Sequence, residues 1–154
     1  MSEPPSARIL VVDDNPDVAG IIRLATRKLP RKVEVVPELN AARALERLRT
    51  ESFDLVISDH KMREMDGLEF LTLARPAEPR EVRLLFTGYA AKLDAASLVA
   101  AHLDGFLEKP LLLEAMRAVL GAVLDRDPQT LAALKRALAS RVAAAAANPP
   151  PSRP

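Results

Sequence analysis

Two adjacent carboxylates, Asp13 and Asp14, follow directly after the apolar run from Ile9 to Val12. Side by side at the mouth of a buried strand, they repel each other, and a cation such as Mg²⁺ would relieve that repulsion. The chemistry that this pair suggests is therefore metal binding by oxygen ligands, with the cation shared by a further anionic group.

Polar residues also follow three other apolar runs of the chain. They are Ser58 and Asp59 after the third run, Thr87 and Gly88 after the fourth, and Glu108, Lys109 and Pro110 after the fifth. Ligands of open parallel sheets collect at the carboxyl ends of the strands, so we expect these side chains to meet at one edge. Three carboxylates, a hydroxyl and an ammonium together suit phosphoryl chemistry on a carboxylate, in which Mg²⁺, Lys109 and Thr87 would neutralise and hydrogen-bond the phosphoryl oxygens.

The sequence pattern predicts alternating strands and helices, which would position this site. The strand-like runs are Ile9–Val12, Val33–Val36, Leu55–Ile57, Val82–Phe86 and Phe106–Leu107. Most are continuously apolar, as expected of strands that helices cover on both faces. The pattern predicts an α/β fold, a doubly wound parallel sheet.

The segments between the runs have helical periodicity. Val18, Ile21, Ile22, Ala25 and Leu29 share one face of the first helix, which Asn15 can cap with Pro16 at its first position. The fourth helix, roughly residues 92–102, is alanine-rich and has little to bury, which makes it a candidate for movement. The stripe of the fifth is predicted to include Leu112, Ala115, Met116, Val119 and Val123.

A further helix is predicted after the fifth, with Asp127 as its cap and Pro128 at its first position. Its apolar stripe consists of Leu131, Leu134, Leu138 and Val142. Such a stripe needs a cover, and three remain open: its own domain, a second copy of the chain, or a further domain. We expect a domain at 7–125, a helical extension at 126–147, and tails at 1–6 and 148–154.

Composition narrows the class of protein. The chain has 154 residues, 49% hydrophobic and 28% charged, with a net charge of +1 and no cysteine. It shows no strongly basic surface typical of nucleic-acid binding, no thiol chemistry, and no stretch that would span a membrane. The acidic, proline-bearing N-terminus does not resemble a signal peptide, so we expect a cytoplasmic protein.

Four motifs in order resemble the receiver domain of two-component response regulators. They are the strings Val11–Asp14, Ser58–Gly67, Phe86–Gly88 and Gly105–Pro110. The resemblance covers nearly all of residues 7–125. It implies a (βα)5 fold with five parallel strands in the order 2-1-3-4-5 and, here, an additional C-terminal helix.

The resemblance also implies roles for individual residues. Asp59 would be the phosphoacceptor, and Asp14 would bind Mg²⁺ directly, with Asp13 acting mostly through water. Asp59 and the main-chain carbonyl of Lys61 would complete the protein ligands. The remaining roles fall to three residues: Thr87 would sense the phosphoryl group, Phe106 would be the switch aromatic, and Lys109 would pair with the phosphate beside a cis bond to Pro110.

The same resemblance implies partners and a mode of signalling. A histidine kinase or phosphotransfer protein would donate the phosphoryl group. The output would be a conformational change in the surface of the fourth helix, fifth strand and fifth helix, read by a target protein or a self-dimer. Direct binding of nucleic acid is not evident from the charge of the chain. The chain would be a regulatory phosphoacceptor rather than an enzyme, either stand-alone or part of a longer regulator.

Some residues depart from the family pattern or have plainer explanations. Arg63 stands where the family often has proline, and Lys61 stands where small or polar residues are common. Lys61 and Tyr89 could both cover the phosphoryl group, which predicts slow loss of phosphate from Asp59. His60 and His102 are interpreted as incidental to the chemistry.

Two other classes of protein compete with the receiver hypothesis. An adaptor with the same fold would bind partners without being phosphorylated, and beryllofluoride or acetyl phosphate binding discriminates against it. A phosphatase of the related phosphoaspartate class commonly needs a second aspartate two residues after the nucleophile, where this chain has Lys61.

Overall fold

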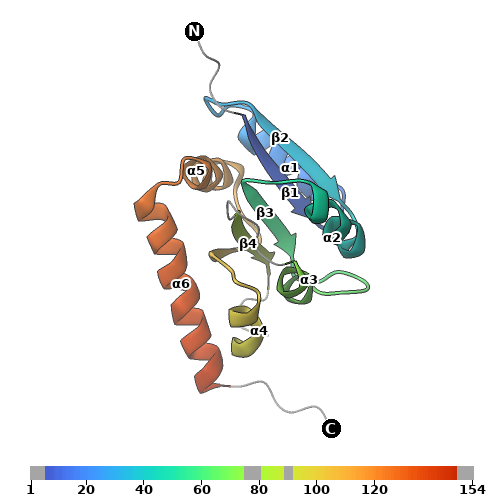
Figure 1. Cartoon of the computed structure of the whole chain (residues 1–154). Helices are drawn as coiled ribbons and strands as arrows, with labels where there is room; N and C mark the ends of the chain where they lie inside the picture. The colour runs from blue at the N-terminus through green and yellow to red at the C-terminus, as the bar shows by residue number, and fades with distance from the viewer. Residues whose placement is uncertain (1–5, 75–80, 89–91, 149–154) are drawn as a thin grey trace.

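The computed structural model describes residues 6–74, 81–88 and 92–148. The strands are β1 Ala7–Val12, β2 Val33–Glu38, β3 Leu55–Asp59, β4 Val82–Thr87 and β5 Gly105–Glu108. The helices are α1 Asp17–Thr26, α2 Ala41–Thr50, α3 Gly67–Leu73, α4 Ala95–Ala100, α5 Leu113–Leu124 and α6 Pro128–Ala147. Strands and helices alternate as the sequence predicts (Figure 1).

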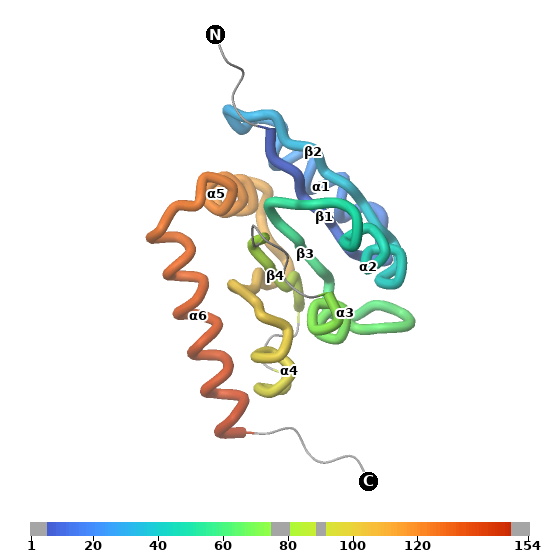
Figure 2. Tube along the Cα trace, in the orientation of Figure 1, coloured from blue at the N-terminus to red at the C-terminus, as the bar shows by residue number. Residues whose placement is uncertain are grey.

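The strands form one parallel sheet in the order β2-β1-β3-β4-β5, which confirms the predicted fold. Helices α1 and α5 contribute to the hydrophobic cluster on one face of the sheet, and α2, α3 and α4 to the cluster on the other. Because both faces are covered, successive residues from Ile9 to Val12 in β1 and throughout β4 are buried whichever way they point. Figure 2 traces this arrangement along the chain.

Side-chain caps fix several helix starts. Asn40 accepts hydrogen bonds from the amides of Ala42 and Arg43, and the carboxylates of Asp66, Asp94 and Asp127 cap α3, α4 and α6. At α1 the Asn15 side chain accepts from the amide of Asp17, so the helix begins one residue later than predicted.

Three further sequence predictions about helices were wrong in detail. Ile21 is 46% exposed and does not belong to the buried face of α1, and Leu112 is 80% exposed at the N-cap of α5. Helix α4 is shorter than predicted, since it begins only after Asp94 and ends at Ala100.

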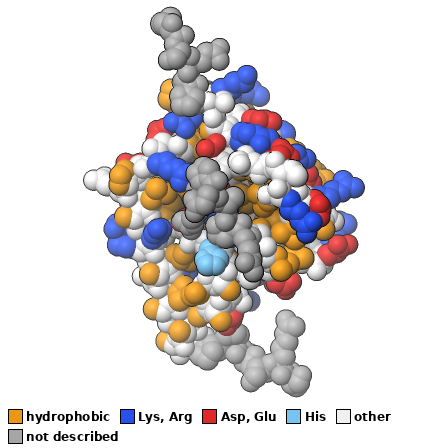
Figure 3. Space-filling view, in the orientation of Figure 1, with side chains coloured by type: hydrophobic (Ala, Val, Ile, Leu, Met, Phe, Trp, Pro, Cys, Tyr) orange, Lys and Arg blue, Asp and Glu red, His pale blue; other side chains and the backbone are white. Residues whose placement is uncertain are grey.

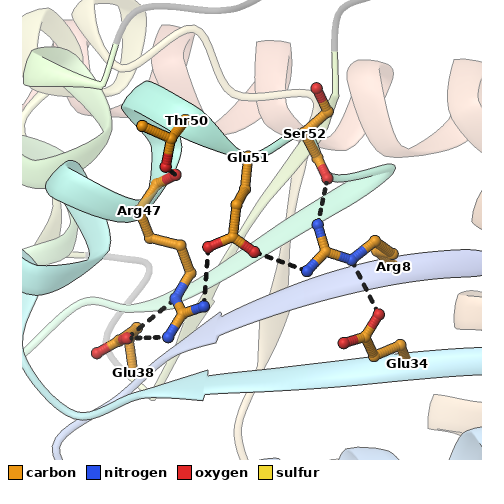
Figure 4. Close-up of polar contacts among 7 residues, drawn as sticks. All are labelled: Arg8, Glu34, Glu38, Arg47, Thr50, Glu51 and Ser52. Atoms are coloured by element: carbon orange, nitrogen blue, oxygen red, sulfur yellow. Dashed lines mark hydrogen bonds and ion pairs between the residues drawn. The ribbon is translucent and has the colours of Figure 1, made fainter.

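A network of ion pairs joins β1, β2 and α2 at the opposite edge of the sheet from β5 (Figure 4). Arg8 lies 2.9 Å from Glu34 and 2.8 Å from Glu51. Arg47 lies 2.9 Å from Glu51 and 2.7 Å from Glu38. The Arg8 guanidinium also lies 4.5 Å above the ring of Phe53. Exposed pairs of this kind contribute about 0–1 kcal/mol each, so the network links α2 to β1 and β2 at a modest gain in stability.

Candidate phosphoryl and metal site

The carboxyl ends of β1 and β3 bring three carboxylates together. One oxygen from each of Asp13, Asp14 and Asp59 lies within 4.8 Å of the others. Asp13 and Asp14 follow the last residue of β1, and Asp59 is the last residue of β3, in strands that pair directly. The sequence predicted this convergence because strand ends of a parallel sheet share one edge.

Lys109 places a cation beside two of the three carboxylates. Its Nζ lies 2.9 Å from Oδ1 of Asp59 and 3.7 Å from Oδ2 of Asp13. The ammonium also lies 5.0 Å from the centre of the Phe86 ring, which limits its freedom to turn away. Its peptide bond to Pro110 is cis, as expected.

The backbone places Thr87 and Phe106 on the two strands at the β5 edge. Thr87 is the last residue of β4 and is buried, and its carbonyl accepts a hydrogen bond from the amide of Lys109. Phe106 lies in β5 opposite Leu85 and is half-buried. Lys61 lies in the loop after β3 with its side chain exposed, and Tyr89 lies outside the described residues.

Two further contacts of the β3–α3 loop shape the site. The Nε of Arg63 lies 4.0 Å from Oδ2 of Asp14, so a cation approaches the acidic cluster from the position where the family often has proline. No sequence signal predicts this contact, because it depends on the loop conformation. At the start of α3, a Cβ on Gly67 would collide with the carbonyl oxygen of Asp59, so this glycine permits the close approach of α3 to the acceptor strand.

The electrostatics of the cluster favour a bound cation. Asp13 is buried, and its Oδ2 has no hydrogen-bond partner among the described residues. Burial raises the pKa of the Asp13 carboxyl, and the nearby charge of Asp59 acts in the same direction, against the hydrogen bond from the Asn15 amide. Three oxygen donors, one of them buried without a hydrogen-bond partner among the described residues, fit a hard divalent cation such as Mg²⁺.

The raised pKa predicts how the metal-free protein responds to pH. Folding favours protonated Asp13, so this stabilisation is complete below the ordinary pKa of 3.8 and is lost as the pH rises through the higher pKa of the folded state. We expect Asp13→Asn to raise the free energy of unfolding at neutral pH by about 1 kcal/mol in EDTA, because it removes a buried charge. Urea unfolding at neutral and mildly acidic pH measures this effect.

Bound Mg²⁺ should favour the unchanged protein over the Asp13→Asn variant. At ten times its dissociation constant, Mg²⁺ should stabilise the unchanged protein by about 1.4 kcal/mol, and Asp13→Asn should lose most of this gain. Asp17→Asn, an exposed aspartate in α1, is the matched control and should keep the magnesium response. Equal stabilisation of the Asp13 variant and the unchanged protein would contradict the assignment of Asp13 to the metal site.

A parallel (βα)5 sheet with this acidic cluster and lysine at its carboxyl edge defines a receiver-type signalling domain. The family model for the response regulator receiver domain matches residues 9–121. The chain belongs to this family, whose members are regulatory phosphoacceptors of two-component signalling.

Individual relatives agree with this assignment. The chain is 30% identical over 143 residues to the transcriptional regulatory protein GlrR of Escherichia coli, covering 92% of this chain and 31% of that protein. It is 35% identical over 105 residues to an uncharacterised 14.6 kDa protein of Leptolyngbya boryana, covering 67% of this chain and 79% of that one. The chain thus spans about a third of the length of GlrR.

A solved structure shares the fold. The response regulator receiver domain protein (CheY-like) from Methanospirillum hungatei has a TM-score of 0.65 and 24% sequence identity, covering 81% of this chain and 98% of that one. Within the described residues, no helix is long and apolar enough to cross a membrane.

Proposed function

We propose that this protein accepts a phosphoryl group on Asp59 from a histidine kinase or phosphotransfer protein and signals by a change of conformation. The observation that carries the proposal is the contact of the Lys109 ammonium with Asp59 inside a cluster of three carboxylates. Family membership supports the same chemistry. We place this receiver in the cytoplasm and assign it to residues 7–125.

In the proposed reaction the carboxylate of Asp59 is the nucleophile. A bond forms between one of its oxygens and phosphorus, the bond from phosphorus to the donor breaks, and the donor leaves with that electron pair. The donor is a phosphohistidine of the partner, or acetyl phosphate in the laboratory, which leaves as acetate. Lys109 neutralises charge on the phosphoryl oxygens, and Thr87 donates its hydroxyl to one of them.

The residues that would hold Mg²⁺ are Asp13, Asp14, Asp59 and the main-chain carbonyl of Lys61. When bound, Mg²⁺ neutralises negative charge on the phosphoryl group and the carboxylates. Asp13 is the more buried of the adjacent pair and Asp14 the more accessible, with side chains 4% and 31% exposed, which suits a division between indirect and direct contact. Asp59 is thus both acceptor and ligand.

A direct test is incubation of the protein with acetyl phosphate and Mg²⁺, followed by intact mass measurement. We expect the mass of one phosphoryl group to be added, EDTA to prevent the addition, and hydroxylamine to remove it as expected of an acyl phosphate. No addition, and no binding of beryllofluoride, would favour an adaptor that is not phosphorylated. Steady release of many phosphates per protein would favour a phosphatase.

The phosphorylated state should be long-lived, because the long Lys61 side chain stands two residues after Asp59 and can shield the phosphoryl group from water. Lys61→Ala should therefore speed the loss of phosphate several-fold, while Lys32→Ala, at an exposed lysine just before β2, should leave the rate unchanged. Phosphate release after removal of the donor gives both rates. A lifetime of seconds that Lys61→Ala does not alter would contradict this role.

A further inference from the structure

Helix α6 covers the free edge of the sheet. It runs from the end of α5 alongside β5 toward α4 (Figure 1), and β5 is the last strand in the sheet order. Leu131 and Leu134 pack against the hydrophobic cluster on the α1 and α5 face. Leu138 and Val142 pack against the cluster on the opposite face, so α6 joins the two sides of the sheet.

The fit between α6 and β5 depends on a glycine. A Cβ built on Gly105, the first residue of β5, would lie 2.8 Å from the Cβ of Leu134. Real Cβ atoms do not approach so closely, and the Leu134 Cβ is fixed to its backbone, so any other residue at position 105 would push the helix away. Gly105 therefore permits the close contact between α6 and β5.

The docking of α6 is nevertheless shallow. Of its 20 residues, all of them described, only Ala145 is buried, whereas four residues of the shorter α5 are buried. A groove between α4 and α6 is lined by apolar side chains that include Leu98, Val99 and Val142. In the space-filling view, hydrophobic side chains remain visible on the part of the molecule where α6 and α4 lie (Figure 3).

The surface of β5 beneath α6 is connected through the sheet to the proposed phosphorylation site. Phe106 lies in β5 next to Gly105 and packs, half-buried, against the same cluster as Leu138 and Val142. Two residues further along the paired strands, Thr87 lies opposite Glu108 and its carbonyl binds the amide of Lys109. A shift of Thr87 toward a phosphoryl group would change the space open to Phe106 and so the surface beneath α6.

We propose that α6 is a built-in ligand of the α4–β5 face and that phosphorylation of Asp59 weakens its docking. In the resting protein, α6 blocks this face from other partners. Its alanine-rich end allows it to remain helical when it detaches, because alanine has the highest helix propensity. This inference rests on the proposed function, since it uses the same switch at Asp59.

Thermodynamic linkage makes the coupling between α6 docking and phosphoryl binding measurable at either site. If an acyl phosphate weakens α6 docking by some factor, loss of α6 docking must strengthen the binding of a phosphoryl analogue by the same factor. A typical coupling of this kind is about fivefold or more. Beryllofluoride with Mg²⁺ is a suitable probe, because it forms a non-covalent analogue of the acyl phosphate.

The first measurement is hydrogen exchange of the full chain with Mg²⁺, with and without beryllofluoride. We expect the amides of α6 to exchange about fivefold faster or more when beryllofluoride is bound, while those of α2, which lies away from α6, stay unchanged. The second is the beryllofluoride affinity by calorimetry. Leu138→Asp should bind about fivefold more tightly or better, and Ala137→Asp, which places the same charge on the exposed side of α6, should bind as the unchanged protein does.

Gly105→Ala provides an independent variant if Leu138→Asp does not fold. Its residue lies outside α6, its backbone does not have positive φ, and it should raise α6 exchange and beryllofluoride affinity together. Binding of beryllofluoride with unchanged α6 exchange and equal affinities in all variants would overturn this inference and leave the proposed function intact. Failure of beryllofluoride to bind to any of the proteins would overturn both.

Discussion

Asp59→Asn is expected to abolish covalent phosphorylation of the protein by acetyl phosphate. The amide lacks the anionic oxygen that would attack phosphorus, while its shape still allows a hydrogen bond from Lys109, whose Nζ lies 2.9 Å from the Asp59 oxygen. The fold should therefore persist and the label should fall to background. Intact mass measurement after incubation with acetyl phosphate and Mg²⁺ reports the loss.

The matched control for this substitution is Asp54→Asn. Asp54 is an exposed aspartate that directly precedes the first residue of β3, whereas Asp59 is the last residue of that strand. The Asp54 carboxylate accepts a hydrogen bond from the amide of Arg8. We expect this variant to be labelled as fully as the unchanged protein. Full labelling of Asp59→Asn would instead move the acceptor to another carboxylate, with Asp13 and Asp14 as the first to be tested.

The candidate site was largely predictable because it depends on topology more than on side-chain detail. Once the apolar runs are recognised as parallel strands, Asp13, Asp14 and Asp59 must meet at one sheet edge, and their oxygens do lie within 4.8 Å. The same reasoning brings Lys109 to this edge. The sensing role of Thr87 and the switch role of Phe106 came from resemblance alone, and their positions in β4 and β5 are compatible with those roles.

Hydrophobic periodicity was less reliable for predicting which residues at the borders of a helix face are buried. It identifies an apolar stripe but not how much of that stripe the neighbouring elements cover, which is why Ile21 was expected to be buried and is 46% exposed. Leu112 precedes α5 and points away from the core, so the helical spacing does not apply to it. The cover of α6 was left open for a related reason, since the close contact of Leu134 with Gly105 joins residues 29 positions apart.

A buried arginine is the feature that sequence periodicity was least able to explain. Arg83 interrupts the apolar run of β4, yet its side chain is only 1% exposed. Its Nε donates to Glu81 at 2.8 Å, and its Nη1 donates to the carbonyl oxygens of Leu71 at 2.6 Å and Ala101 at 3.0 Å. The guanidinium thus ties the C-terminal parts of α3 and α4 to β4, through partners that are distant in sequence.

Arg83→Met is expected to lower the free energy of unfolding by about 3–5 kcal/mol, because it breaks the buried ion pair between Arg83 and Glu81. It also deprives the two carbonyl groups of their donor. Urea unfolding measures the loss, and the double variant Arg83→Met with Glu81→Gln should recover part of it by removing the buried negative charge that Arg83 contacts. Arg49→Met, which breaks an exposed pair with Glu46, should cost about 1 kcal/mol or less. Equal costs for Arg83→Met and Arg49→Met would show that the buried network contributes no more than a surface ion pair.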